Sequence, residues 1–138
     1  MARRLASQTD GAGPIMTVLL LGLAGGVGAV ARFMVDGLIR ARLKTALPWG
    51  TILINVSGSL VLGFLAGLMM RGEASETLYL VLGTGFLGGY TTFSTASLET
   101  IRLIQSGRAG LALINGVGSM AACVLAAAAG VGLTFLLP

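Results

Sequence analysis

The stretch Gly83-Thr-Gly-Phe-Leu-Gly-Gly-Tyr-Thr-Thr-Phe-Ser-Thr-Ala-Ser97 decides the fold that the sequence predicts. It lies inside a long apolar segment, yet it contains four glycines and seven hydroxyl side chains. In hydrocarbon an unpaired backbone group is costly, so irregular backbone survives only where protein or a water-filled cavity surrounds it. The glycine pair followed by hydroxyl residues therefore predicts a membrane helix that is interrupted between about Gly88 and Ser94. Broken helices of this kind present backbone dipoles to ions.

The composition around this stretch is typical of an integral membrane protein. Of the 138 residues, 55% are hydrophobic and 10% are charged, whereas soluble domains are about 25% charged. Because a span needs roughly 20 apolar residues, the chain has room for about four spans and little else. We expect a polar tail over residues 1–14 and then one all-α membrane domain with spans over about 15–39, 49–70, 77–104 and 109–136.

The residue types that carry most enzyme chemistry are scarce. The chain has no histidine and one cysteine, Cys123, which excludes a disulfide framework and a cysteine metal cluster. Of the five carboxylates only Glu99 falls at a plausible membrane depth, and no carboxylate pair or serine–histidine arrangement is present. We therefore predict that the protein is not an enzyme. The net charge of +4 is placed at span ends, where cations serve topology and lipid rather than nucleic acid.

Neutral polar residues recur along the predicted spans. One face of the second span carries a residue of this kind at every fourth position: Thr51, Asn55, Ser59 and Gly63. The fourth span repeats the pattern with Asn115, Ser119 and Cys123. An asparagine in a span either bonds a neighbouring helix or lines a solvated pathway. Lines of hydroxyls and amides suit the weak, multi-site passage of a small ion.

Several single residues have two readings. Arg32, near the end of the first span, either snorkels to the interface or attracts anions at a pore mouth. Glu99 lies either in a wet vestibule or in an ion pair, with Arg102 on the next turn as the candidate partner. Phe93 either packs against a helix or lipid, or offers its electropositive ring edge to an anion. Gly22 and Gly26 form a small-xxx-small pair that predicts close helix approach.

Three motifs, in this order and spacing, resemble the signatures of the Fluc (CrcB) fluoride channels. They are Gly25-Gly-Val-Gly-Ala-Val-Ala-Arg32, Pro48-Trp-Gly-Thr-Ile-Leu-Ile-Asn-Val-Ser-Gly-Ser59, and Gly85-Phe-Leu-Gly-Gly-Tyr-Thr-Thr-Phe-Ser-Thr95 followed by Glu99. The resemblance covers the chain from about Ile15 to the end.

The resemblance implies a four-span protein that assembles as an antiparallel, dual-topology homodimer in the bacterial inner membrane. Such a dimer holds two pores that export cytoplasmic fluoride passively and give fluoride resistance. It also implies a structural sodium ion (Na+) at the dimer centre, held by backbone carbonyls of Gly88 and Thr91. The Lys/Arg count of three on one side and five on the other is a weak orientation bias.

By motif position, the pore residues implied for fluoride are Asn55, Phe93, Ser119 and Arg32. We further expect hydroxyl donors from Ser94 and Thr95, with Glu99 and Thr51 as possible vestibule residues. The chain departs from the family pattern where a second phenylalanine, a tyrosine and a serine are usual, because it has Ala96, Asn115 and Cys123 there.

Two other functions fit a chain of this kind. One is a four-span, dual-topology small multidrug transporter driven by protons, which should need a membrane-embedded carboxylate in the first span. The first span has only Asp36, near its end. The other is a membrane subunit that transports nothing and whose glycines serve helix packing alone.

Overall fold

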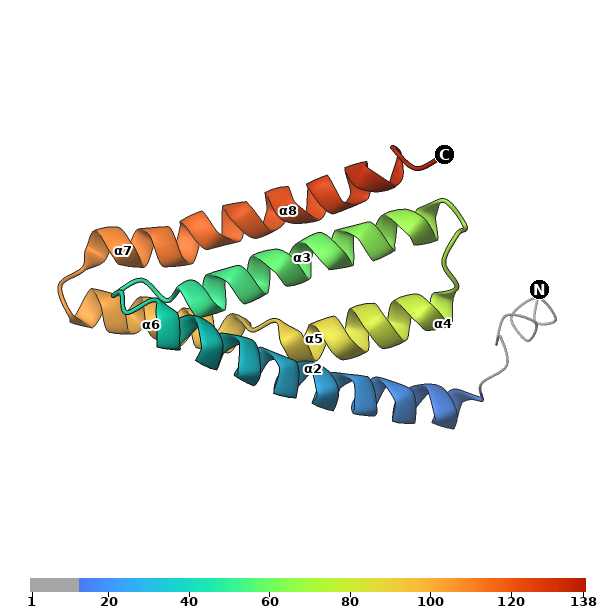
Figure 1. Cartoon of the computed structure of the whole chain (residues 1–138), viewed down its shortest axis with the longest axis horizontal. Helices are drawn as coiled ribbons and strands as arrows, with labels where there is room; N and C mark the ends of the chain where they lie inside the picture. Colours follow the sequence, from blue (N-terminus) through green and yellow to red (C-terminus); the bar gives the residue numbers. More distant parts are fainter. Residues whose placement is uncertain (1–12) are drawn as a thin grey trace.

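The computed structural model describes residues 13–138, and within that range the chain is helical with no strand (Figure 1). Its elements in order are α2 (Pro14–Arg42), α3 (Trp49–Met70), α4 (Glu76–Leu78), the π-helix η1 (Tyr79–Leu87), α5 (Gly88–Tyr90), α6 (Phe93–Gln105), α7 (Ala109–Leu113), the π-helix η2 (Ile114–Gly118) and α8 (Ser119–Thr134). Most of the predicted tail, residues 1–12, lies outside the described part. Within residues 13–138, three helical stretches are long and apolar enough to cross a membrane: 14–42, 49–70 and 109–134. The prediction of an all-helical, multi-pass membrane protein is confirmed.

The third segment consists of two helical parts joined by two extended residues. Thr91 has φ −79° and ψ 162°, and Thr92 has φ −151° and ψ 122°, so the helix stops at Tyr90 and resumes at Phe93. The preceding part contains the nine-residue π-helix η1, which includes Gly83 and Gly85, while Gly88 and Gly89 lie in α5. The interruption predicted from the sequence is therefore present, and it is limited to two residues.

The four segments run side by side and pack as two pairs (Figure 1). α3 packs along α8, and α2 packs along η1 and α5, while α2 also contacts α3. α6 is packed mainly against α7 and η2. The two parts of the broken segment therefore pack against different neighbours.

Glycines allow both pairs to approach closely. A Cβ atom on Gly28 would overlap the carbonyl of Phe86, and a Cβ on Gly89 would overlap the carbonyl of Gly25. Gly63 stands in the same relation to the Ala127 backbone across α3 and α8. Between helices in lipid there is little hydrophobic driving force, so this backbone contact is a main source of attraction.

The register of the small residues on α2 differs from the prediction. Gly22 and Gly26 have nothing within 4 Å of a built Cβ among the described residues, so their predicted close contact is wrong. The contact with the third segment is made by Gly25 and Gly28. Several glycines in one helix satisfy the same spacing rule, and only the rotation of α2 decides which of them face a neighbour.

We expect Gly28→Ala to lower the free energy of unfolding by about 1–3 kcal/mol, because a methyl group would collide with backbone that cannot move aside easily. Gly37→Ala, on the same helix with open space around it, should be neutral or stabilising by about 0.5–1 kcal/mol. Unfolding in mixed micelles measures both. Equal effects of the two variants would contradict the assigned contact.

Candidate functional site

Asn55 of α3 holds the break of the third segment. Its Nδ2 donates to the carbonyl of Thr92 at 2.8 Å, and its Oδ1 accepts from the amide of Thr92 at 2.8 Å. A single side chain thus pairs with both polar backbone groups of an extended residue that is 8% exposed. Without this pairing, both groups would be buried and unsatisfied, which is costly at membrane depth.

Thr92 is also the N-cap of α6. Its hydroxyl oxygen accepts from the amide of Thr95 at 3.2 Å, and the two hydroxyls lie 3.0 Å apart as a hydrogen bond. An N-cap of this type satisfies one of the free amides in the first turn. The remaining free amides give the N-terminus of α6 a partial positive charge, which favours a nearby anion.

The break also leaves carbonyl oxygens without helical partners. Because the Thr92 amide donates to Asn55, it does not bond the carbonyl of Gly88 four residues earlier. The Thr95 amide donates to the Thr92 hydroxyl, so the carbonyl of Thr91 loses its helical partner as well. Nη1 of the half-buried Arg32 reaches that Thr91 carbonyl at 3.4 Å. The predicted arginine therefore lies against the break.

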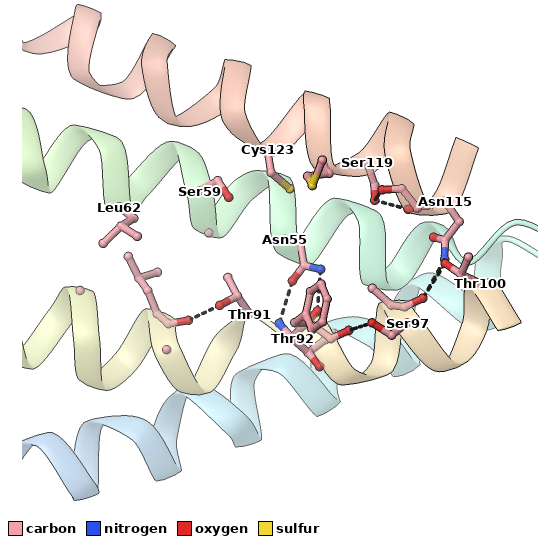
Figure 2. Close-up of a pocket in the computed structure, with 18 of the residues that line it drawn as sticks. Asn55, Ser59, Leu62, Thr91, Thr92, Ser97, Thr100, Asn115, Ser119 and Cys123 are labelled. Atoms are coloured by element: carbon pink, nitrogen blue, oxygen red, sulfur yellow. Dashed lines mark hydrogen bonds between the residues drawn. The ribbon is translucent and has the colours of Figure 1, made fainter. Parts of the chain in front are cut away.

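A pocket of ≈ 650 Å³ lies between α3, the third segment and the last helix (Figure 2). Five residues predicted for the site line it: Asn55, Gly88, Thr91, Phe93 and Ser119. Five others are not among its lining residues: Arg32, Thr51, Ser94, Thr95 and Glu99. We call this pocket the groove. Phe93 remains 86% exposed in the single chain, so its ring borders the open side.

The sequence reasoning missed the part that α6 contributes to the groove. Ala96, Ser97 and Thr100 line it together with Phe93 and Ile101. These positions follow the i, i+3, i+4, i+7 and i+8 spacing of one helix face. That spacing was available in the sequence and would have selected Ser97 and Thr100.

Asn115, a member of the polar line predicted for the fourth span, bonds the neighbouring helix α6. It is fully buried, and its Nδ2 donates to the carbonyl of Ala96 at 3.1 Å and to the hydroxyl of Thr100 at 2.9 Å. Its backbone carbonyl accepts from the hydroxyl of Ser119. The Oδ1 of Asn115 has no hydrogen-bond partner among the described residues.

On the opposite side of α6, Glu99 points to α2. Its Oε1 lies 2.6 Å from Nη2 of Arg40, whose Nε lies 2.7 Å from Oδ2 of Asp36. The predicted partner of Glu99, Arg102, was wrong, because α2 comes close enough to supply an arginine from another segment. Asp36 in turn lies against Gly50 in the first turn of α3, where a carboxylate is stabilised by the helix dipole.

Thr51 is the remaining member of the predicted vestibule. It is 2% exposed and lies one turn before Asn55 on α3, beyond the lining of the groove. Gly63, at the other end of the line of small and polar residues on α3, packs against the backbone of α8. Only Asn55 and Ser59 of that line border the groove.

This arrangement defines a class: a small multi-pass helical membrane protein whose interrupted third segment borders a mostly apolar groove that carries a few hydroxyl and amide side chains. The family model described as CrcB-like protein, Camphor Resistance (CrcB), matches residues 19–131, and the chain belongs to this family. It is 48% identical to the fluoride-specific ion channel FluC 1 of Leifsonia xyli over 118 residues, which are 86% of this chain and 85% of that one.

Two further relatives are also fluoride-specific ion channels by name. The fluoride-specific ion channel FluC of Novosphingobium aromaticivorans is 49% identical over 74% of this chain and 82% of its own. The fluoride-specific ion channel FluC 2 of Nitrobacter hamburgensis is 44% identical over 86% of this chain and 96% of its own.

Replacing Asn55 with leucine should strand the amide and the carbonyl of Thr92. We expect a loss of about 2–5 kcal/mol in the free energy of unfolding, since each buried unsatisfied group costs about 1–3 kcal/mol. Hydrogen exchange should also accelerate at the Thr92 amide. Ser57→Ala, two residues away, is the matched control, because the Ser57 hydroxyl bonds its own helix and the Tyr90 hydroxyl but not the backbone of Thr92. An unchanged exchange rate at Thr92 would rule out the pairing.

The Arg40 pairs should respond asymmetrically to substitution. Arg40→Gln leaves the buried Glu99 carboxylate without its cation, whereas Glu99→Gln leaves Arg40 paired with Asp36. We expect Arg40→Gln to cost about 1–3 kcal/mol, the desolvation cost of a stranded polar group, and Glu99→Gln to cost less. Unfolding of the two single variants and the double variant measures this. The pairing is refuted if Arg40→Gln costs as much in the Glu99→Gln background as alone.

Proposed function

We propose that the protein is a fluoride-selective channel that lets cytoplasmic fluoride leave the cell passively and so confers resistance to it. Membership in the family supports this proposal, as do relatives up to 49% identical that are named fluoride-specific ion channels. The observation that carries it is the break of the third segment, because it places the N-terminus of α6 and the Asn55 amide beside one groove. We place the channel in the bacterial inner membrane.

The chemistry of the groove fits a small, strongly hydrated anion. Fluoride can exchange its water for neutral amide and hydroxyl donors, which bind it well enough to admit it and weakly enough to release it. Asn55 uses one Nδ2 hydrogen on the Thr92 carbonyl and keeps the other. The ring of Phe93 adds an electropositive edge on the open side.

Arg32 would bring a fixed positive charge to the break, beside the groove rather than in its lining. It is half-buried within α2 and lies against the break through the Thr91 carbonyl. A cation in a low-dielectric cleft raises the local anion concentration. Glu99 of α6 pairs with Arg40 on the side of the helix away from the groove. No carboxylate is therefore among the described residues that line the groove.

We infer that the working unit is a homodimer of antiparallel copies with two pores. In one chain the groove is open, Phe93 is 86% exposed, and large apolar side chains cover most of the outer surface. A second copy would close the groove and cover Phe93. The weak bias of positive charge between the two sides of the membrane, three Lys/Arg against five, is compatible with insertion in both orientations.

The carbonyls released by the break fit a sodium ion at the centre of that dimer. Gly88 and Thr91 lose their helical amide partners, and unwound carbonyls of this kind coordinate sodium in other membrane proteins. The ion would neutralise the carbonyl dipoles of two copies where they meet. In a single chain Arg32 contacts the Thr91 carbonyl, so the arginine and sodium would share that oxygen.

The proton-coupled multidrug alternative receives little support. Its coupling carboxylate would have to be Asp36, which is paired with Arg40 near the end of α2. A proton carrier needs a carboxylate that exchanges its proton during transport. The flux measurement below separates the two functions, because the alternative transports no fluoride.

Purified protein in lipid vesicles should release fluoride far faster than protein-free vesicles and should release chloride no faster than they do. Phe93→Leu should lower fluoride efflux about tenfold, the effect of losing one contact of about 1.4 kcal/mol. Its effect on folding should be small, because the ring is exposed. Phe135→Leu, at an exposed phenylalanine near the end of the chain, is the control. Fluoride efflux at the level of empty vesicles would refute the proposed function.

A further inference from the structure

Four positive side chains have no role in holding the bundle together. Within residues 13–138, ion pairs involve only two of the cations, Arg40 and Arg71. Arg32 contacts the carbonyl of Thr91 beside the break. The remaining cations of that range form neither an ion pair nor a side-chain hydrogen bond within it. We call these four residues the basic collar: Arg42, Lys44, Arg102 and Arg108.

The basic collar comes from two connections that meet at one end of the bundle. Arg42 ends α2 and Lys44 follows it, while Arg102 lies in the last turn of α6 and Arg108 precedes α7. Figure 1 shows the end of α2, the end of α6 and the start of α7 at the same end. The ion pair of 2.6 Å between α2 and α6 ties the two helix ends together. The four cations are therefore neighbours in space.

The two ends of the bundle differ in charge. Within the described residues, the end with the basic collar carries five cations, because Arg40 also lies there, against two carboxylates that Arg40 holds. The opposite end carries Arg71 against Glu73 and Glu76. Arg71 is engaged there with Glu73 and with carbonyls at the end of α8. Available positive charge is thus concentrated at one end, where it attracts anions.

The surroundings of the basic collar point to a lipid rather than to a free anion. All four of its side chains are exposed, and so are the apolar side chains of Leu43, Trp49 and Ile101 next to them. A tryptophan at this position is typical of the headgroup region of a membrane. Long basic side chains keep their charge in that region while their stems cover apolar surface. An anion bound here has room for acyl chains beside it.

The basic collar also stays accessible in the proposed dimer. Arg102 follows Phe93 by nine residues, which is two and a half helical turns, so it lies on the face of α6 opposite to Phe93. Phe93 lines the groove that a second copy would close, and none of the four cations does. With antiparallel copies, one basic collar would lie in each leaflet.

We propose that the basic collar binds the headgroup phosphate of an anionic phospholipid, with the acyl chains along the apolar surface beside it. Each lysine or arginine near an anionic membrane surface adds to the attraction. This inference goes beyond the proposed channel function, because it follows from the placement of charge and would hold for a chain that conducts nothing.

The single tryptophan of the chain gives a direct test. Trp49 is the first residue of α3 and is 40% exposed, so it reports on the lipids beside the basic collar. Bromine atoms on an acyl chain quench tryptophan fluorescence on contact. In vesicles of mixed phosphatidylglycerol and phosphatidylcholine, we expect brominated phosphatidylglycerol to quench Trp49 more than brominated phosphatidylcholine at the same mole fraction. The difference should shrink at about 1 M salt, where the screening length is about 3 Å.

Substitutions in the basic collar test which charges matter. The double variant Lys44→Gln/Arg102→Gln should lower the relative affinity for phosphatidylglycerol about fivefold or more, since one cation near an anionic surface is worth about that factor. Arg102→Lys keeps the charge and should keep the preference. Glu76→Gln, added to the double variant, restores one unit of net charge at the opposite end of the bundle. It should not restore the preference.

Equal quenching by the two brominated lipids in the natural chain would overturn the proposal. Recovery of the preference through Glu76→Gln would overturn it as well, because total charge rather than the basic collar would then select the lipid. Unchanged thermal unfolding of the variants excludes misfolding. Fluoride efflux from the same vesicles separates the two proposals. A chain that conducts without lipid preference refutes the lipid site alone, and lipid preference without efflux refutes the channel function alone.

Discussion

The two hydrogen bonds between Asn55 and Thr92 are the constraint on which the rest of the structure depends. An extended residue in the middle of a membrane segment exposes an amide and a carbonyl that lipid cannot satisfy. One carboxamide matches both groups, because it carries a donor and an acceptor side by side. The break can therefore exist without water at Thr92, and α3 must lie at the distance that lets the asparagine reach it.

The close packing of the glycines serves the same end. Gly25, Gly28 and Gly89 bring α2 against the part of the third segment that precedes the break. That contact carries Arg32 to the Thr91 carbonyl. On the far side, Asn115 and the Arg40–Glu99 pair fix α6 from two directions. Each half of the broken segment is thus anchored separately, which an uninterrupted helix would not need.

The sequence was sufficient for features that depend on local pattern. The glycine and hydroxyl content of residues 83–97 predicted the interruption. The four-residue spacing of polar side chains in the second and fourth spans selected Asn55, Ser119 and Cys123, which line one groove. The sequence was insufficient where more than one residue could pair with the same side chain. Glu99 has a candidate arginine one turn away, yet Arg40 of another segment binds it. The choice depends on how α2 and α6 are placed, which helical periodicity does not encode.

A single interruption also separates the two signs of the backbone dipole. The part before the break ends in carbonyls at Gly88 and Thr91, and the part after it begins with the amides of α6. Carbonyls attract cations and helix N-termini attract anions. In the proposed channel, the carbonyls before the break would bind sodium and the amides at the start of α6 would attract fluoride, on either side of Thr91 and Thr92. Since Asn55 holds Thr92 between them, a change at Asn55 would disturb the proposed sites of both ions together.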